Sequence, residues 1–362
     1  MRAVVLVGGE GTRLRPLTYS TPKQLLPVVE VPMLERVLGH LARYGVDEAV
    51  LSIGYRPDAF LTAYPDGTAA GVRVSYAVEP EPLDTAGAIR FAAVHAGVTE
   101  TFIVVNGDVL TDLDVAALVD FHHSHGAEAT IHLTAVDDPS RFGVVPTDDA
   151  GRVVAFVEKP PPGEAPTNLI NAGTYVLEPS VLERIPDGRR VSIERETFPA
   201  LAADGAVYAL ASNSYWLDTG TPAAYLEANA DLLDGTRPGL PAPGAVAVAD
   251  GVWTMGDPLI DGDILPFSLV GRGAAVHRSA TVRSSVIGAG AVVQMGAAVT
   301  GSVLLPGAVV GAGASVTGSI LGRGAVVGEQ CVISPLTVLG DDTEVGAGVR
   351  VVDGRIPAVA TT

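Results

Sequence analysis

The sequence predicts an α/β protein in two parts: a doubly wound, mixed but mostly parallel sheet, followed by a parallel β-helix of hexapeptide repeats. Three observations lead to this prediction. Strand-like aliphatic runs alternate with helical segments over residues 1–233, as a doubly wound sheet requires. A segment rich in proline and glycine follows at 234–244. Beyond it, aliphatic pairs recur every five or six residues, which is typical of a β-helix.

The composition indicates a globular chain with an acidic balance. Of its 362 residues, 48% are hydrophobic, and this length exceeds the usual size of one domain. The net charge of −18, from 23 Lys and Arg against 41 Asp and Glu, argues against nucleic acid or an anionic membrane as a general partner. A single cysteine, Cys331, suits a reducing compartment. Neither a signal-like segment nor a membrane-spanning run is recognisable, so we expect a cytoplasmic protein.

The first strand and the loop after it predict a phosphate site. Residues 3–7 are an aliphatic run without alternation, typical of a buried parallel strand. Gly-Gly-Glu-Gly-Thr-Arg-Leu-Arg-Pro-Leu-Thr follows at 8–18, and Pro-Lys-Gln-Leu-Leu-Pro at 22–27. Glycines let backbone N–H groups approach phosphate oxygens, and Arg13, Arg15 and Lys23 add positive charge. The loop lacks the Gly-Lys-Ser/Thr ending of a P-loop and the third glycine of a dinucleotide fingerprint.

The next elements continue the alternation. A helix over 32–44 places aliphatic side chains on one face and stops at Gly45, and strands at 48–53 and 72–78 flank a helix near 57–64. Leu-Asp-Thr-Ala-Gly at 83–87 opens another helix, whose free N–H groups could hold a base or a phosphate. Ordinary N-capping by Asp84 or Thr85 explains these residues equally well. Asp84 either accepts the two N–H donors of guanine or faces water.

The central strand at 101–105 ends in Asn106-Gly107-Asp108. A carboxylate at the carboxyl end of such a strand points into the same crevice as the first loop, where magnesium needs an oxygen ligand. A structural turn is the alternative. The histidines at 122–125 lie at the end of a helix over 115–122 without a ligand set, so we expect no transition metal there.

Three later segments complete the sheet and its edge. A strand at 153–157 ends in Glu158-Lys159-Pro160, which suits a sugar hydroxyl and a phosphate but also an ordinary surface ion pair. Ser192 is expected to cap a short helix. Asp218 lies in a turn after Trp216, where its carboxylate is available for a ligand. Alternatively, it is the N-cap of the helix that Pro222 begins.

The motifs at 8–18 and 22–27 closely resemble the signature of the sugar-1-phosphate nucleotidylyltransferases, the NDP-sugar pyrophosphorylases. The resemblance implies a Rossmann-like catalytic domain and Mg2+ bound by Asp108 and Asp218. It also implies sugar contacts from Gly143, Glu158, Asn171 and Gly173, with Lys159 on the sugar phosphate. Residues 191–199 are similar to the mannose-1-phosphate guanylyltransferase branch, although GTP-using relatives have glycine where Asp84 stands.

The catalytic residues expected are Arg13, Lys23 and Lys159. The complete expected substrate site comprises Leu6, Gly8, Gly9, Gly11, Thr12, Arg13, Lys23, Asp84, Thr85, Gly87, Asn106, Gly107, Asp108, Gly143, Glu158, Lys159, Asn171, Gly173 and Asp218.

The implied reaction transfers GMP from GTP to mannose 1-phosphate and releases pyrophosphate. A phosphate oxygen of the sugar phosphate attacks the α-phosphorus, so the protein must mainly position and neutralise two polyanions. One alternative is the same chemistry with glucose 1-phosphate and dTTP, UTP or ATP. Another is a non-catalytic regulatory paralogue that binds a nucleotide sugar.

The second part of the chain has a period of 17 residues, seen at Ile287, Leu304, Leu321 and Val338. Coils of three short sides predict a β-helix with coils about 4.8 Å apart, and the resemblance implies that it is left-handed. His277 is the only histidine after the linker, so no catalytic set is recognisable there. We expect a catalytic domain at 1–233, a linker at 234–244 and a β-helix at 245–362. The exposed end coil favours a homo-oligomer.

Overall fold

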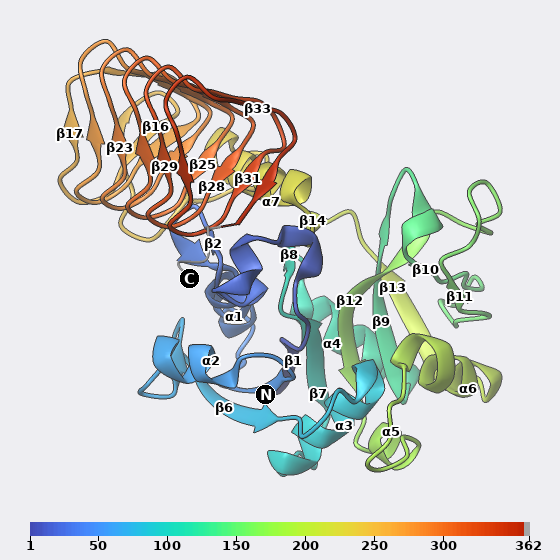
Figure 1. Ribbon diagram of the computed structural model, residues 1–362. Coiled ribbons are helices and arrows are strands. Elements are labelled where there is room, and N and C mark those ends of the chain that lie inside the picture. The colour runs from blue at the N-terminus through green and yellow to red at the C-terminus, as the bar shows by residue number, and fades with distance from the viewer. Residues whose placement is uncertain (358–362) are drawn as a thin grey trace. The chain divides into compact units, whose positions relative to one another are not determined.

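The structure is a computed structural model that describes residues 1–357. Its residues form two compact units, each visible in Figure 1. Unit 1 comprises Met1–Gly9 and Leu34–Leu217, and unit 2 comprises Glu10–Met33 and the chain from Asp218 onward. This division differs from the one expected from the sequence, because the loop after Gly9 groups with the β-helix rather than with the sheet.

The sheet of unit 1 is mixed, as predicted. Its centre is the parallel set β6, β4, β1 and β7, and β12 joins β7 in the antiparallel direction. The chain runs from β1 outward through β4 to β6 and then returns to the other side of β1 with β7. The sheet therefore has its topological switch point between β1 and β7, where open α/β sheets bind ligands.

The strands of this unit are β1 (Arg2–Leu6), β4 (Glu48–Ile53), β5 (Thr68–Ala69), β6 (Val72–Val78), β7 (Phe102–Asn106), β8 (Val109–Thr111), β9 (Ala129–Ala135), β10 (Gly143–Val144), β11 (Val157–Glu158), β12 (Leu169–Leu177) and β13 (Val207–Ala211). The helices are α1 (Met33–Ala42), α2 (Pro57–Ala63), α3 (Asp84–His95), α4 (Val115–His125), α5 (Ser180–Glu183) and α6 (Phe198–Ala203).

Helix faces and caps follow from the sequence. The aliphatic face of α1 is buried, with Leu34 and Leu38 fully inaccessible. Ser192 caps the π-helical turn Ile193–Thr197 by accepting a hydrogen bond from the N–H of Arg195, which confirms the predicted cap. His122 is buried on α4, and its two ring nitrogens contact Thr130 and Glu178. This histidine therefore belongs to the packing of the sheet.

Unit 2 contains α7 (Pro222–Asp234) and the β-helix, and β14 (Trp216–Asp218) leads into it. Its loop segment forms three 3-10 turns and the hairpin of β2 (Pro27–Val28) and β3 (Val31–Pro32). Thr221 caps α7 by accepting the N–H of Ala224. The cap of α7 is therefore Thr221 and not Asp218.

The β-helix has three faces, consistent with the left-handed form, and its parallel coils are visible in Figure 1. The first face is β15 (Val246–Ala249), β16 (Val252–Thr254), β19 (Ser268–Val270), β22 (Val286–Ile287), β25 (Val303–Leu304), β28 (Ile320–Leu321), β31 (Val338–Leu339) and β34 (Arg355–Ile356). The second is β17 (Leu259–Ile260), β20 (Ala275–Val276), β23 (Val292–Val293), β26 (Val309–Val310), β29 (Val326–Val327) and β32 (Glu344–Val345). The third is β18 (Asp263–Ile264), β21 (Thr281–Arg283), β24 (Ala298–Thr300), β27 (Ser315–Thr317), β30 (Val332–Ile333) and β33 (Arg350–Val351).

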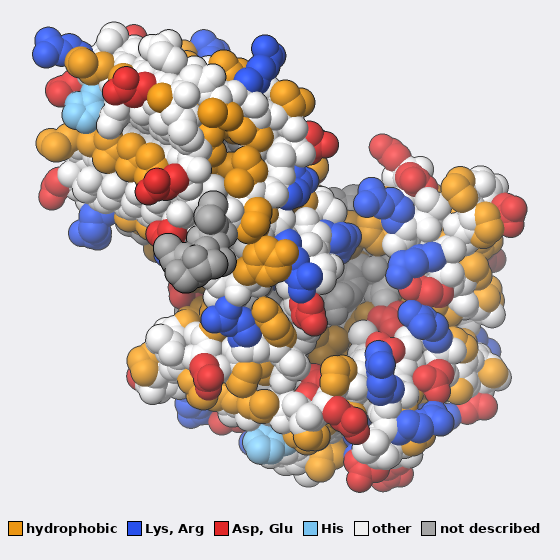
Figure 2. Space-filling model, in the orientation of Figure 1, with side chains coloured by type: hydrophobic (Ala, Val, Ile, Leu, Met, Phe, Trp, Pro, Cys, Tyr) orange, Lys and Arg blue, Asp and Glu red, His pale blue; other side chains and the backbone are white. Residues whose placement is uncertain are grey.

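The predicted period holds for two coils and then lengthens by one residue. Ile287 pairs with Leu304 and Leu304 with Leu321, as expected. Leu321, however, pairs with Leu339 and not with Val338, so the last prediction of the series is wrong. The extra residue lies in the corner at 334–337, where Leu336 adopts a φ of 62°. Figure 2 shows the coils covered largely by uncharged side chains and backbone, with charged side chains at their edges.

Candidate active site

The ends of β1 and β7 lie side by side at the switch point. The N–H of Gly107 donates to the carbonyl of Leu6 at 2.9 Å. A Cβ on Gly107 would lie 3.1 Å from that carbonyl oxygen and 2.9 Å from Cγ1 of Val7, so only glycine allows this approach. The turn from Asn106 to Asp108 is thus held directly beside the strand that leads into Gly8.

A bulge in β12 faces the same edge. The pairing of β12 with β9 shifts register between Asn171 and Tyr175, and Gly173 has a φ of 75°. A Cβ on Gly173 would lie 2.5 Å from Nδ2 of Asn106. Asn171 accepts the N–H of Gly173 at 2.9 Å and donates to the hydroxyl of Tyr175 at 2.8 Å. The bulge therefore brings three residues of the expected site together: Asn106, Asn171 and Gly173.

Glu158 and Lys159 lie at the end of β11, opposite Gly143. Gly143 pairs with Glu158, and a Cβ on it would lie 2.9 Å from Oε2 of that carboxylate and 2.6 Å from the ring of Phe156. Lys159 has a left-handed φ of 48°, so the strand ends there. Its Nζ lies 3.0 Å from Oε1 of Glu158, and its side chain is 61% exposed. The acid and the base thus form an ion pair at a strand end, where both side chains can turn to one side.

The start of α3 is bound by another segment of unit 1. The N–H groups of Ala86 and Gly87 both donate to the carbonyl of Val191. The hydroxyl of Thr85 donates to Glu194 and accepts the N–H of Ile193, each at 2.8 Å. These first-turn donors are therefore used inside the protein, and a substrate contact by Thr85 or Gly87 stays a prediction.

Asp84 occupies a position whose backbone favours glycine. Its φ is 60°, and its Oδ1 accepts the N–H of Thr85 at 2.9 Å. Aspartate tolerates this left-handed conformation better than most residues do. Aspartate at position 84 therefore adopts a backbone conformation that a glycine would also allow.

The carboxylate of Glu79 is a candidate that the sequence reasoning missed. It follows β6 and accepts hydrogen bonds from the hydroxyl of Ser52 and the N–H of Leu83, both at 3.0 Å. Its Oε1 would lie 3.5 Å from a Cβ on Gly8, and about as close to one on Gly54, at 3.8 Å. The available signal was its place directly after a strand, at the same edge of the sheet as Gly8.

Unit 2 holds two of the three expected catalytic cations, Arg13 and Lys23. Nη2 of Arg13 lies 3.8 Å from Oδ2 of Asp218, and the arginine side chain is 56% exposed. The N–H of Gly220 donates to Oδ1 of Asp218 at 2.9 Å, and a Cβ on Gly220 would collide with Arg13. A side chain at position 220 would therefore displace the Arg13 guanidinium from its present place beside Asp218.

Lys23 is buried in the same loop. Gly11 has a φ of 60°, and its carbonyl accepts the hydroxyl of Thr18 at 2.9 Å. A Cβ on Gly11 would lie 2.9 Å from Cγ2 of Thr18 and 3.2 Å from Cβ of Lys23. Arg15 instead pairs with Glu10 at 2.5 Å and lies over the ring of Tyr19. Of the cations of this loop, Arg13 therefore lies beside Asp218, and Lys23 packs beside Gly11.

The expected site residues thus fall into two groups, and the chain passes between the two units at Gly9–Glu10, at Met33–Leu34 and at Leu217–Asp218. The group in unit 1 contains Leu6, Gly8, Gly9, Asp84, Thr85, Gly87, Asn106, Gly107, Asp108, Gly143, Glu158, Lys159, Asn171 and Gly173. The group in unit 2 contains Gly11, Thr12, Arg13, Lys23 and Asp218. Among residues 1–357 no group of three or more His, Cys, Asp or Glu side chains could hold a metal ion.

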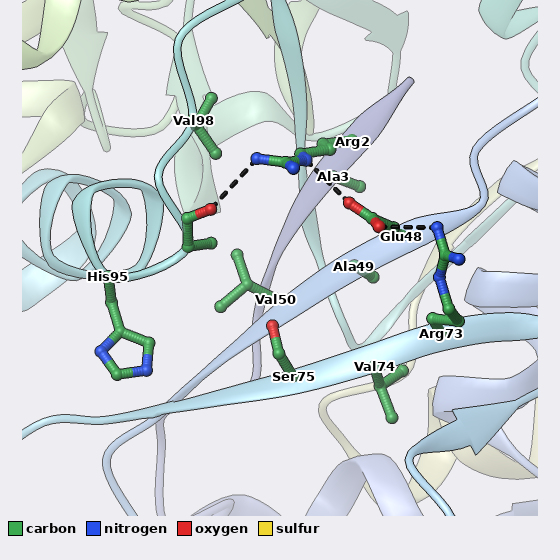
Figure 3. Close-up of a pocket in the computed structure, with 11 residues that line it drawn as sticks. Arg2, Ala3, Glu48, Ala49, Val50, Arg73, Val74, Ser75, His95 and Val98 are labelled. Atoms are coloured by element: carbon green, nitrogen blue, oxygen red, sulfur yellow. Dashed lines mark hydrogen bonds and ion pairs between the residues drawn. The ribbon is translucent and has the colours of Figure 1, made fainter.

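A cavity of about 360 Å³ lies at the opposite edge of the sheet (Figure 3). It is lined by the first residues of β1, β4 and β6 and by the end of α3. Arg2 donates to Glu48 at 2.7 Å and to the carbonyls of Ala96 and Gly97, and Arg73 donates to the same glutamate. Ligands of such sheets bind at the carboxyl edge, so this cavity lies away from the edge where the nucleotide is expected.

Comparison with known proteins tests the family that the loop at 8–18 predicts. The family model described as "Nucleotidyl transferase" matches residues 2–235, and the one described as "GMPPB C-terminal domain" matches residues 264–359. This chain belongs to the nucleotidyl transferase family. Membership of this family confirms the prediction made from the loop at 8–18 and from the alternating strands and helices.

Similar proteins extend over most of the chain. The chain is 45% identical over 280 residues to "Mannose-1-phosphate guanylyltransferase" of Mycobacterium tuberculosis, with 76% of each chain covered. It is 40% identical over 292 residues to "Mannose-1-phosphate guanylyltransferase 1" of Arabidopsis thaliana, with 79% of each covered. These relatives of the family cover parts of both the sheet and the β-helix.

Two solved proteins are similar in fold to a little under two thirds of this chain. HddC from Yersinia pseudotuberculosis, also solved in complex with GMP-PN, is 31% identical with a TM-score of 0.55 and covers 63% of this chain and 97% of its own. A putative glucose-1-phosphate thymidylyltransferase from Bacillus anthracis, in complex with a sucrose, is 25% identical with a TM-score of 0.58. That match covers 64% of this chain and 94% of the other. None of the described helices is long and apolar enough to cross a membrane.

Proposed function

We propose that this chain transfers GMP from GTP to mannose 1-phosphate, giving GDP-mannose and pyrophosphate. The observation that carries the proposal is the 45% identity to a protein named for this reaction, and a glycine-rich loop that contains Arg13 and Lys23 supports it. An enzyme with a net charge of −18 must bind two polyanionic substrates through local positive charge. Arg13, Lys23 and Lys159 are the residues that supply it.

The proposed reaction requires that the protein position its two substrates, and it requires no protein nucleophile. A phosphate oxygen of mannose 1-phosphate forms a bond to the α-phosphorus of GTP, and the bond from that phosphorus to the β-phosphate oxygen breaks. The attacking oxygen is already ionised at neutral pH, so no general base is needed. Arg13 and Lys23 neutralise the triphosphate, Lys159 holds the sugar phosphate, and Glu158 and Asn171 bind sugar hydroxyls.

Asp108 and Asp218 are proposed to hold a divalent ion, which supplies charge neutralisation between the phosphate groups when it is bound. Each of these carboxylates follows or ends a short strand, and magnesium in such enzymes takes one or two carboxylates together with substrate phosphates. That pattern is compatible with the lack of a larger ligand cluster among residues 1–357.

Glu79 is proposed to read the guanine base. Guanine presents N1–H and an exocyclic amine, and a carboxylate can accept from both. The carboxylate of Glu79 lies against the backbone of Gly8, whereas that of Asp84 closes a turn onto Thr85. Asp84 remains the second candidate for this contact.

The test is a matrix of GTP, ATP, UTP and dTTP against mannose 1-phosphate and glucose 1-phosphate, read by pyrophosphate release with and without chelator. We expect turnover with GTP and mannose 1-phosphate that stops when magnesium is removed. A preference for glucose 1-phosphate with another triphosphate would replace the substrate pair and keep the chemistry. Turnover with none of the pairs, together with tight binding of a nucleotide sugar, would favour the regulatory paralogue.

Two further expectations belong to this proposal. We propose that the protein acts in the cytoplasm, consistent with its single cysteine, and that it forms a homo-oligomer. The exposed aliphatic edge strands at the first coil, β15 and β17, support the second point. Sedimentation of the purified protein measures it directly.

A further inference from the structure

One corner of the β-helix forms a continuous column in successive coils. It consists of Ala289, Pro306, Arg323 and Asp341, which follow β22, β25, β28 and β31. The carbonyls of the first three residues of this corner column accept backbone hydrogen bonds from the next coil. The donors are the N–H groups of Gly307 to Ala289, Gly324 to Pro306 and Asp342 to Arg323. The coil that is one residue longer keeps Asp341 in this column, because its extra residue lies earlier, at 334–337.

The corner column contacts the loop that carries Arg13 and Lys23. The hydroxyl of Ser20 donates to Oδ2 of Asp341 at 2.5 Å, while Oδ1 of the same carboxylate accepts the N–H of Arg323 at 2.8 Å. A Cβ on Gly340 would lie 3.2 Å from Cβ of Pro16, so the missing side chain leaves room for the loop to lie on the coil.

A second contact holds the strained end of the loop. Val29 and Glu30 form the two-residue turn between β2 and β3 with φ values of 46° and 64°, which a β-branched residue such as valine rarely adopts. The N–H of Val29 donates to Asn229 of α7 at 2.7 Å, and Oε2 of Glu30 accepts the N–H of Ala289 at 3.2 Å. Such a conformation persists only where its surroundings fix it.

Glu30 is bound to the column by charge as well. Burial raises the pKa of its carboxyl group, whereas the Ala289 N–H and the guanidinium of Arg323 lower it. The loop is therefore attached at both ends of the segment that contains Lys23, once through Ser20 and once through Glu30.

We propose that the corner column is a template that sets the conformation of the catalytic loop, with Asp341 and Ser20 as positioning residues for the cations of that loop. The kinetic part of this inference rests on the proposed function. Asp341 touches no reacting atom and acts through Ser20 on the segment between Gly11 and Lys23. The β-helix then contributes to catalysis without a catalytic residue of its own.

The test compares Ser20→Ala, Asp341→Ala and the double variant by hydrogen exchange of amides 11–33 and by steady-state kinetics. We expect faster exchange confined to this segment and a roughly three- to tenfold fall in kcat/KM for the triphosphate. The KM for the sugar phosphate should stay within about twofold, because the residues assigned to it belong to unit 1. The double variant should be no worse than Asp341→Ala alone, since both changes remove the same bond.

Two controls separate positioning from general loss of structure. Ser20→Thr keeps the hydroxyl and should restore exchange and kinetics, and Glu344→Ala removes an exposed acid from β32 and should change neither. Unchanged exchange of 11–33 in all three variants would overturn the proposal, as would losses that simply multiply in the double variant. The exchange result needs no substrate, so it stands even if the proposed reaction proves wrong.

Discussion

The mixed sheet of unit 1 and the β-helix of unit 2 use their strand ends in opposite ways. In unit 1, β1 pairs with β7 across 100 residues of sequence, as in Ala3 with Ile103, so strand ends bring together groups from distant segments. In the β-helix the strands of the coils have two or three residues and pair with the next coil, and their ends lead into short corners. The sheet of unit 1 thus brings functional side chains from distant segments together at its strand ends. The short strands of the β-helix instead form a regular stack of coils.

The largest expected effect comes from the sheet. Asp108→Asn keeps the size of the side chain and removes the proposed metal charge, so we expect kcat to fall by about 100-fold or more. Thermal unfolding should change little. Asp149→Asn alters an exposed acid of unit 1 outside the proposed site and serves as the matched control. Activity within a few-fold of the wild type in Asp108→Asn would remove this residue from the site.

The next effect tests whether the β-helix is chiefly support. Ile333 on β30 is 1% exposed in the core of the coils, and Ile333→Ala should lower the free energy of unfolding by about 3 kcal/mol. Its neighbour Val332 is 38% exposed, and Val332→Ala should change the free energy of unfolding by less than about 0.5 kcal/mol. Both variants should retain kcat at 25 °C. Equal effects of the two would contradict the burial pattern.

A pH series distinguishes the two regions by their histidines. Burial lowers the pKa of His132 on β9 to about 4, and burial also lowers that of His122. Since the unfolded chain takes up protons below about pH 6.5 and folded His132 does not, this residue alone should cost about 2 kcal/mol of stability by pH 5. The β-helix has only His277, which is exposed.

The measurement is a two-probe unfolding series between pH 7.5 and pH 4.5, with His132→Gln as the variant. We expect the transition of unit 1 to move to lower temperature on acidification and the variant to lose part of that slope. If the pH dependence of the unfolding temperature is the same in the variant, the protonation of His132 does not contribute to the loss of stability.

The smallest expected effect concerns Asp84. Because its φ of 60° favours glycine, Asp84→Gly should change stability by less than about 1 kcal/mol. If Glu79 reads guanine, the variant should also keep the preference for GTP over ATP, whereas Glu79→Gln should weaken it. A lost preference in Asp84→Gly would instead assign the base contact to Asp84.

Local and periodic features could be predicted from the sequence, and most of them follow from one segment at a time. The aliphatic period located the stacked pairs at Ile287, Leu304 and Leu321, because each coil repeats the same local pattern. It failed at Val338, since one extra corner residue changes the register of everything after it. The cap at Ser192 was predictable for the same reason: its partner is three residues away.

Features that depend on distant contacts could not be predicted. Nothing near Ser20 shows that it meets Asp341, 321 residues later. Glu79 stands in a proline-rich stretch with another acid, and only the sheet order places it beside Gly8. Likewise, the glycines at 107 and 173 are explained by the neighbours that fill the place of their missing side chains, and these come from other strands.

The chain's crossings at Gly9–Glu10 and at Leu217–Asp218 have a practical consequence for anyone who would cut or recombine this protein. A truncation at the proline-rich linker looks natural in the sequence, yet it would leave Pro16, Ser20 and Glu30 without the surface on which they rest. Chimaeras that exchange repeat segments between relatives should therefore carry the matching stretch of residues 10–33 with them. Residues 10–33 and the coils that they contact must therefore come from the same parent protein.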